Sequence, residues 1–229
     1  MDRRRGDHVR LPGTSARRAL KGAVFGLAVC LLATACGGDE EPEPERVTAA
    51  EQCDDTLSPE AARALEVVLG TEKFSHDPRG GLERSVDGLA EDYAKAERRP
   101  PSHSLCRASR PGVHEVAIGF RLYRDDDLLG DGRYAGIHPY DMGVEAHAGP
   151  ERAYLFVRCV SPRLKGSDSR NARIKGTLTY NWSKLPDTVP VREATLTVLH
   201  SVTLAVVRKL GCENDAGLTE KPVFKPKPE

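Results

Sequence analysis

The sequence carries no net charge, because its 34 lysines and arginines are balanced by 34 aspartates and glutamates. Seven of the basic residues and two of the acidic residues lie within the first 36 positions. The rest of the chain therefore has 27 basic and 32 acidic side chains, a net charge of −5. Domains that bind nucleic acids usually show a basic excess that attracts phosphates. The charge balance predicts no nucleic-acid partner.

Catalytic motifs are absent as well. The sequence contains no Gly-x-Ser-x-Gly nucleophile motif, and no glycine-rich phosphate-binding loop follows a predicted strand. The aspartates of the stretch RDDDLLGDGRY, residues 124–134, lack the spacing of an EF-hand calcium loop. We therefore predict no catalytic residue and no cofactor from motifs.

A long apolar run is missing too. The run at residues 22–35, GAVFGLAVCLLATA, has 14 residues, whereas an uncleaved transmembrane helix needs about 20. Basic residues precede this run, from Arg3 to Lys21, and the small residues Ala33, Thr34 and Ala35 end it. A basic start, a short apolar core and a small-residue cleavage site are typical of a secretory signal peptide.

The residue that follows this run is Cys36, and the segment resembles a bacterial lipoprotein signal with its lipobox. Ala33 stands where that family usually has leucine, and Leu32 lies one position further out. The resemblance implies that the Cys36 thiol is acylated and becomes the first residue of the mature protein. It also implies that membrane lipid holds the protein at the extracytoplasmic face of the cell membrane.

Two alternatives remain open for this segment. The first is an ordinary signal peptide cut near Ala35, in which Cys36 has no role. The second concerns the export route, because Arg17 and Arg18 partly resemble a twin-arginine signal, which would imply export in the folded state rather than by the general secretory route.

Four cysteines lie beyond the signal segment: Cys53, Cys106, Cys159 and Cys212. An even number of cysteines in an exported chain predicts disulfides. Four cysteines allow three connectivities, and we favour Cys53 with Cys106 and Cys159 with Cys212, which closes each half of the domain on itself. A four-thiolate zinc site is disfavoured because such sites use closely spaced Cys-x-x-Cys pairs.

Composition divides the chain into four parts: a lipoprotein signal peptide at 1–36, a disordered acidic Pro/Gly tether at 37–51, a single α+β domain at 52–216 and a disordered tail at 217–229. The tether has too few apolar groups to offset the entropy cost of ordering it. The tail is polar and rich in lysine and proline.

Two amphipathic helices are predicted at the start of the domain. Ser58-Pro59-Glu60 is a helix start, and Gly70 ends the helix. A second helix carries Leu82, Val86, Leu89 and Tyr93 on one face.

The later part of the domain changes to a period of two. Residues 114–124, 153–160 and 174–180 alternate as strands, and no long helix joins them, which predicts an antiparallel sheet. Residues 191–210 return to a helical pattern. Its polar positions form one stripe that we expect to face solvent: Glu193, Thr197, His200, Ser201 and Arg208. The predicted fold class is α+β, with an antiparallel sheet of about 3–5 strands covered by two N-terminal helices and a long C-terminal helix.

The start CDDTLSPEAARALEVVLG, a second cysteine on the following strand and the long closing helix resemble uncharacterised actinobacterial secreted lipoproteins over residues 53–212. The pair Cys159 and Cys212 departs from the commoner two-cysteine form. Those families have no general known activity, so the resemblance implies location and fold class but no mechanism.

One loop concentrates candidate functional groups. The stretch GIHPYDMGVEAH supplies the donor types of a zinc or manganese site: His138, Asp141, Glu145 and His147. Its spacing matches no established metal motif. The same loop also offers adaptable contact groups for binding: Tyr134, His138, Tyr140 and Met142.

Two functions are consistent with these observations. The first, which we favour, is a non-enzymatic envelope lipoprotein whose domain binds a partner protein, a cell-wall component or a small-molecule ligand. The alternative is an envelope enzyme, a metal-assisted hydrolase that uses the loop at 138–147.

Overall fold

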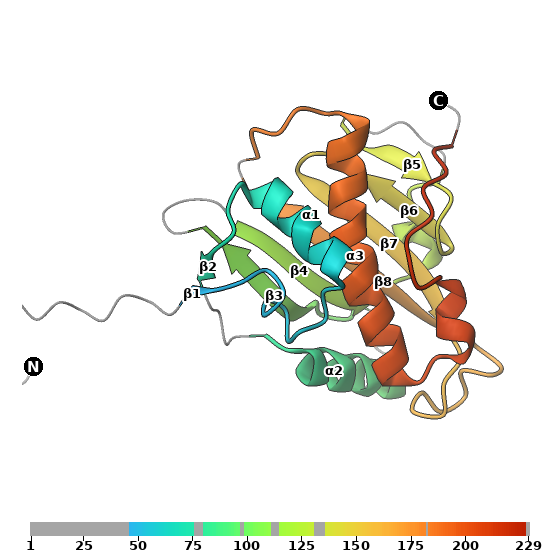
Figure 1. The fold of residues 1–229 in the computed structure, drawn as a ribbon. Helices are drawn as coiled ribbons and strands as arrows, with labels where there is room; N and C mark the ends of the chain where they lie inside the picture. The colour runs from blue at the N-terminus through green and yellow to red at the C-terminus, as the bar shows by residue number, and fades with distance from the viewer. Residues whose placement is uncertain are drawn as a thin grey trace, which may run out of the picture. The chain divides into compact units, whose positions relative to one another are not determined.

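An eight-stranded antiparallel sheet forms the centre of the fold, in the strand order β1-β2-β3-β4-β8-β7-β6-β5 (Figure 1). The computed structural model describes residues 46–75, 80–96, 99–110, 115–130, 136–181 and 183–227. The predicted signal peptide, Cys36 and most of the tether lie outside these residues. The described end of the tether departs from the expected disorder, because Arg46–Val47 pairs with Phe74–Ser75 and Ala49 is buried. None of the helices in the described ranges is both long and apolar enough to cross a membrane.

The strands are β1 (Arg46–Val47), β2 (Phe74–Ser75), β3 (His103–Ser109), β4 (Glu115–Leu122), β5 (His138–Tyr140), β6 (Glu145–Ala148), β7 (Arg152–Cys159) and β8 (Ala172–Tyr180). The helices are α1 (Pro59–Leu69), α2 (Leu82–Lys95) and α3 (Val189–Leu210), with short 3-10 turns at Asp125–Asp127 and Glu213–Gly217. The α+β class and the antiparallel sheet are confirmed, whereas the count of 3–5 strands is wrong. The additional strands are short or irregular: β1, β2, β5 and β6 have two to four residues each, and β3 carries a register shift between Ser104 and Cys106.

Local signals fix α1. The Ser58 hydroxyl accepts a hydrogen bond from the Ala61 N–H at 3.2 Å, and Pro59 occupies the first turn. Gly70 ends the helix with a left-handed backbone, φ 62°, which favours glycine. The predicted helix is therefore confirmed at both ends.

Helices α1 and α3 cross the same face of the sheet, and α2 lies beside the C-terminal part of α3 (Figure 1). The approach of α3 to the sheet is close. A Cβ atom on Gly176 of β8 would lie 3.0 Å from the Thr203 hydroxyl and 3.2 Å from the Leu199 side chain. A larger residue at Gly176 would therefore push α3 away from the sheet.

The polar stripe expected on the surface of α3 is largely buried, which corrects the sequence interpretation. His200 is only 1% exposed, and Thr197 and Ser201 are also buried. The Ser201 hydroxyl accepts from the Ser58 N–H at 2.8 Å and donates to the Thr56 carbonyl at 2.9 Å, so it joins α3 to the start of α1. Segments outside α3 supply partners for Ser201 and His200, whereas the Thr197 hydroxyl donates to the Glu193 carbonyl of the same helix.

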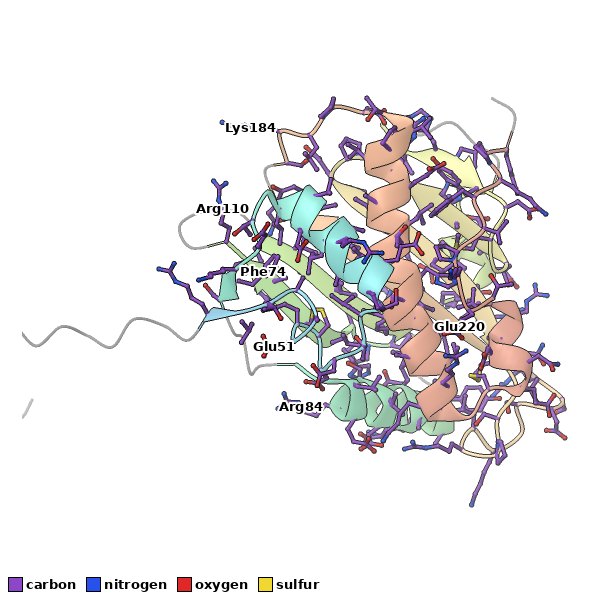
Figure 2. All side chains as sticks on the ribbon, viewed as in Figure 1. Glu51, Phe74, Arg84, Arg110, Lys184 and Glu220 are labelled. Atoms are coloured by element: carbon purple, nitrogen blue, oxygen red, sulfur yellow. A yellow bond between two sulfur atoms is a disulfide. The ribbon has the colours of Figure 1, made fainter. Side chains whose placement is uncertain are left out.

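The segment after α3 covers His200. Its ring makes a hydrogen bond to the backbone of Thr219, and Glu220 lies beside α3 and accepts from Arg208 at 2.5 Å (Figure 2). Burial lowers the pKa of His200 by more than the Thr219 hydrogen bond and the Glu220 carboxylate raise it. The fold therefore favours the neutral imidazole.

The described part of the expected tail is ordered against β5, which corrects the expectation of disorder over 217–229. The Asp141 N–H donates to the Lys225 carbonyl at 2.8 Å, and Tyr140 forms a β-bridge with Pro226. Leu218 is buried and Phe224 packs on the core. These two apolar anchors, within a segment rich in lysine and proline, explain the difference.

Two disulfides join the four cysteines in the favoured pairing. Cys53 bonds to Cys106, with Cα atoms 4.8 Å apart, and Cys159 bonds to Cys212, with Cα atoms 5.1 Å apart. The first bond ties the segment before α1 to β3, and the second ties the end of β7 to the end of α3. Each bond spans 53 residues of sequence.

Candidate functional site

The four candidate metal ligands do not come together. His138 Nε2 lies 2.9 Å from Asp187, whereas His147 Nε2 lies 2.8 Å from Glu145, and Asp141 is exposed. Across the described ranges, no group of three or more His, Cys, Asp or Glu side chains is placed to hold a metal ion. The reason is that residues 138–148 contain two paired strands rather than an open loop. In that pairing His138 lies opposite Ala148 and His147 lies opposite Pro139, so their side chains leave opposite faces of the sheet.

Each histidine has a local partner that explains its position. Asp187 accepts hydrogen bonds from both His138 and Arg192, which fixes the start of α3 against β5. Burial acts to raise the pKa of Asp187, but the hydrogen bonds and charges of His138 and Arg192 together outweigh it and lower the pKa.

Glu145 holds a second cluster together. Its carboxylate accepts from the backbone N–H groups of Leu129 at 2.7 Å and Gly130 at 3.1 Å, as well as pairing with His147. His147 is completely buried, and Glu145 is 8% exposed. The pair therefore anchors the segment after β4 to β6.

The expected binding surface on the same stretch is also corrected. Tyr140 is 1% exposed, packs edge-on against Phe224 and accepts from Arg192 at 3.4 Å, and Met142 is buried. Tyr134 lies outside the described residues. The β5 register turns Tyr140 toward the helices, so its aromatic ring serves the core rather than a surface.

A cavity of about 310 Å³ lies where the end of α2, the end of β4 and the start of β8 meet. Its walls combine two tyrosines, a leucine and three arginines: Tyr93, Tyr123, Leu122, Arg124, Arg170 and Arg173. This volume falls at the lower end of the range of small-molecule sites, about 300 to 1,000 Å³. Apolar and cationic groups thus face one space.

Backbone pairing and one side chain fix the geometry of this cavity. The Tyr123 N–H donates to the Arg173 carbonyl at 2.8 Å, which continues the pairing of β4 with β8 beyond Leu122. From α2, the Tyr93 hydroxyl donates to the Arg170 carbonyl at 2.7 Å, and the Arg170 guanidinium lies 5.8 Å from the centre of the Tyr93 ring. Tyr93 therefore holds the loop before β8 in place.

Tyr123 forms the inner wall. It is 4% exposed, and its ring meets that of Phe156 edge-on at 5.1 Å. Burial raises the pKa of Tyr123, while the guanidinium groups of Arg158 and Arg173 act in the opposite direction. The net upward shift keeps the phenol neutral at physiological pH.

A second cavity of about 380 Å³ adjoins the first and shares Pro100 and Arg124 with it. Arg99, Arg121, Asp126 and Asp127 complete the described lining. Here Asp127 receives two hydrogen bonds from Arg121, at 2.5 and 3.3 Å, and one from the Arg124 N–H at 2.8 Å. Burial acts to raise the pKa of Asp127, but these hydrogen bonds and the nearby positive charges together outweigh it and lower the pKa.

Another cavity, of about 400 Å³, lies beside the Cys53–Cys106 disulfide. Side chains of both charges line it, including Glu51 and Arg84, which lie near the start of α2 (Figure 2). The Asp54 carboxylate accepts from the Leu82 N–H at 2.7 Å and so caps α2. The polar groups of this cavity therefore serve the fold. We regard the first cavity, which Arg124, Arg170 and Arg173 line, as the candidate site and call it the arginine-lined cavity.

The sequence interpretation missed this site. Its residues come from three distant segments, around Tyr93, Tyr123 and Arg170, and no local motif connects them. For the aspartates at 125–127 the sequence favours a solvated turn over a calcium site, and the structure pairs each of them with an arginine.

Comparison with known proteins adds no assignment. No protein-family model matches the sequence, and searches of the curated proteins and of the solved structures give no significant match.

Proposed function

We propose that this chain is a lipid-anchored extracytoplasmic binding domain, which presents the arginine-lined cavity to a small ligand outside the membrane. The signal-like segment that ends at Cys36 supports the location. The two disulfides also support it, since such bonds persist mainly in oxidising compartments.

The convergence of aromatic, aliphatic and guanidinium groups in one cavity carries the binding function. Specific small-molecule sites combine an apolar lining with a few placed polar groups, as this cavity does. Its described lining contains no carboxylate, imidazole, thiol, or serine or threonine hydroxyl, the groups that usually act as nucleophile or general base. Binding is therefore the function that the geometry supports best.

Replacing Cys36 with serine tests the anchor. The wild-type protein is expected in the membrane fraction, because a diacylated cysteine provides two apolar chains, and the Cys36→Ser protein in the soluble extracytoplasmic fraction. Cys30→Ser is the matched control, because this second cysteine of the signal segment is not expected to carry lipid. Recovery of the wild-type protein in the soluble fraction, or of Cys36→Ser in the membrane fraction, would contradict the anchor.

Closing the cavity mouth tests the binding site. Asn171 lines the cavity and Asn181 follows the other end of β8, and both are exposed. Small molecules that raise the melting temperature of the wild type are expected to stabilise Asn181→Trp equally and to bind Asn171→Trp at least about tenfold more weakly. Calorimetric titration of the same compounds measures the change. Equal affinity for the two variants would place the binding site elsewhere.

A further inference from the structure

We infer that the ligand of the arginine-lined cavity is an oxyanion that carries an apolar group. When the cavity is empty, Asp125 and Asp126 pair with the arginines that this oxyanion would bind. The inference rests on the proposed function, because it names the ligand class of the same cavity. The two adjoining cavities and the contacts of their arginines carry it.

The charges around the two cavities are unequal. The described side chains include five arginines, at positions 99, 121, 124, 170 and 173, and three aspartates, at positions 125, 126 and 127. The balance is an excess of two positive charges. Guanidinium groups present several donors in a planar fork that matches carboxylate and phosphate oxygens. The cavities therefore favour an anion over a neutral or cationic ligand.

The lining also requires an apolar part in the ligand. Leu122, Pro100 and the Tyr93 ring lie in the same cavity as Arg124 and Arg173. A bare inorganic anion would leave these groups facing water, whereas an aryl or alkyl group would cover them. The preferred ligand is thus an amphiphilic oxyanion, either a carboxylate or a phosphate ester.

The three aspartates of the 3-10 turn are held very differently. Asp127 is 23% exposed and accepts three hydrogen bonds, so it is part of the fixed wall. Asp125 is 71% exposed and pairs with Arg173 at 2.7 Å, and Asp126 is 72% exposed and pairs with Arg124 at 3.3 Å. Exposed pairs of this kind contribute only about 0 to 1 kcal/mol each.

A ligand can therefore displace Asp125 and Asp126 from these arginines at a small cost in free energy. Arg124 and Arg173 both line the first cavity, so an oxyanion placed there would replace the carboxylates of Asp126 and Asp125. The two aspartates act as internal competitors that neutralise the arginines without filling the apolar part of the cavity. Their removal should strengthen anion binding.

The test uses the exported chain carrying Cys36→Ser and calorimetric titration with four probes: phenyl phosphate, benzoate, inorganic phosphate and benzyl alcohol. At least one aromatic oxyanion is expected to bind at least about tenfold more tightly than both inorganic phosphate and benzyl alcohol. The better of the two aromatic oxyanions identifies the phosphate or the carboxylate as the preferred headgroup. Arg173→Gln should weaken that binding at least about tenfold, in the range expected for a charge-assisted contact.

A separate double variant tests whether Asp125 and Asp126 compete with the ligand. Asp125→Asn with Asp126→Asn should tighten binding of the aromatic oxyanion by about threefold to tenfold, because two exposed ion pairs no longer need to be broken. The matched control is Asp87→Asn with Glu220→Gln, which removes two exposed carboxylates that pair with Arg163 and Arg208 outside the cavity lining. Melting temperatures of both variants should stay close to that of the wild type.

Two results would overturn the inference. Equal effects of the two double variants would show that only net charge matters, and equal binding of benzyl alcohol and the oxyanions would show a neutral site. In either case compounds that bind the wild type and fail on Asn171→Trp would still support the proposed binding function. Absence of any such compound would contradict the proposed function itself.

Discussion

Replacing Glu145 with alanine is expected to destabilise the domain by about 3 to 5 kcal/mol, because several donors lose a carboxylate acceptor and each buried donor left unsatisfied costs about 1 to 3 kcal/mol. The carboxylate is the acceptor for the Leu129 and Gly130 N–H groups and for the completely buried His147. Alanine would remove this acceptor from the buried His147 ring and from the half-buried Leu129 N–H, whereas the exposed Gly130 N–H can bond to water instead. A fall in melting temperature of roughly 10 °C is expected for a domain of this size.

Two variants control this experiment. Glu145→Gln keeps the shape and one carbonyl acceptor, so its cost should be about 1 to 2 kcal/mol. Glu151→Ala removes an exposed glutamate before β7 and should change stability by less than about 0.5 kcal/mol. Urea unfolding followed by circular dichroism measures all three. A loss below about 1 kcal/mol for Glu145→Ala would show that the cluster contributes little.

Removing the second disulfide, by Cys159→Ala with Cys212→Ala, is expected to lower the free energy of unfolding by about 4 kcal/mol, within a usual range of about 2 to 5. The bond spans 53 residues, and chain entropy assigns that cost to freeing the loop in the unfolded state. Both cysteines are buried, so the end of α3 also loses its covalent link to β7.

Denaturant unfolding with and without a reducing agent measures this effect. The wild type should lose stability on reduction through both bonds, whereas the double variant should respond only through Cys53–Cys106. Removal of the other disulfide, by Cys53→Ala with Cys106→Ala, is the matched control because it frees a loop of the same length. An unchanged midpoint for Cys159→Ala with Cys212→Ala would contradict the expected contribution.

Elements with strong local signals were predictable from the sequence. Ser58, Pro59 and Gly70 agree on α1, and alternation marks β4, β8 and, less strictly, β7, in which Phe156 is buried as well. The short strands gave no such signal. A strand of three residues that contains Pro139 has too little periodicity to separate it from a loop, and its pairing with β6 decides its conformation.

Burial depends on what packs over an element, and this limited the prediction of functional residues. His200 lies on the polar stripe of α3, but the chain around Thr219 covers it. The arginine-lined cavity is harder still to predict from the sequence, because Tyr93, Tyr123 and Arg170 meet only through the tertiary fold. Spacing along the sequence also suggested a metal site at 138–147, and the alternation of paired strands divides that set between two faces.

The Cys53–Cys106 bond also determines how a pull on the N-terminal side of the chain is transmitted. The covalent path runs from Cys53 directly to β3, so tension bypasses residues 54–105, including α1 and α2. Tension can separate β1 from β2, but further extension has to break the pairing of β3 with β4. The domain is thereby protected against mechanical unravelling from the end at which we propose it is tethered.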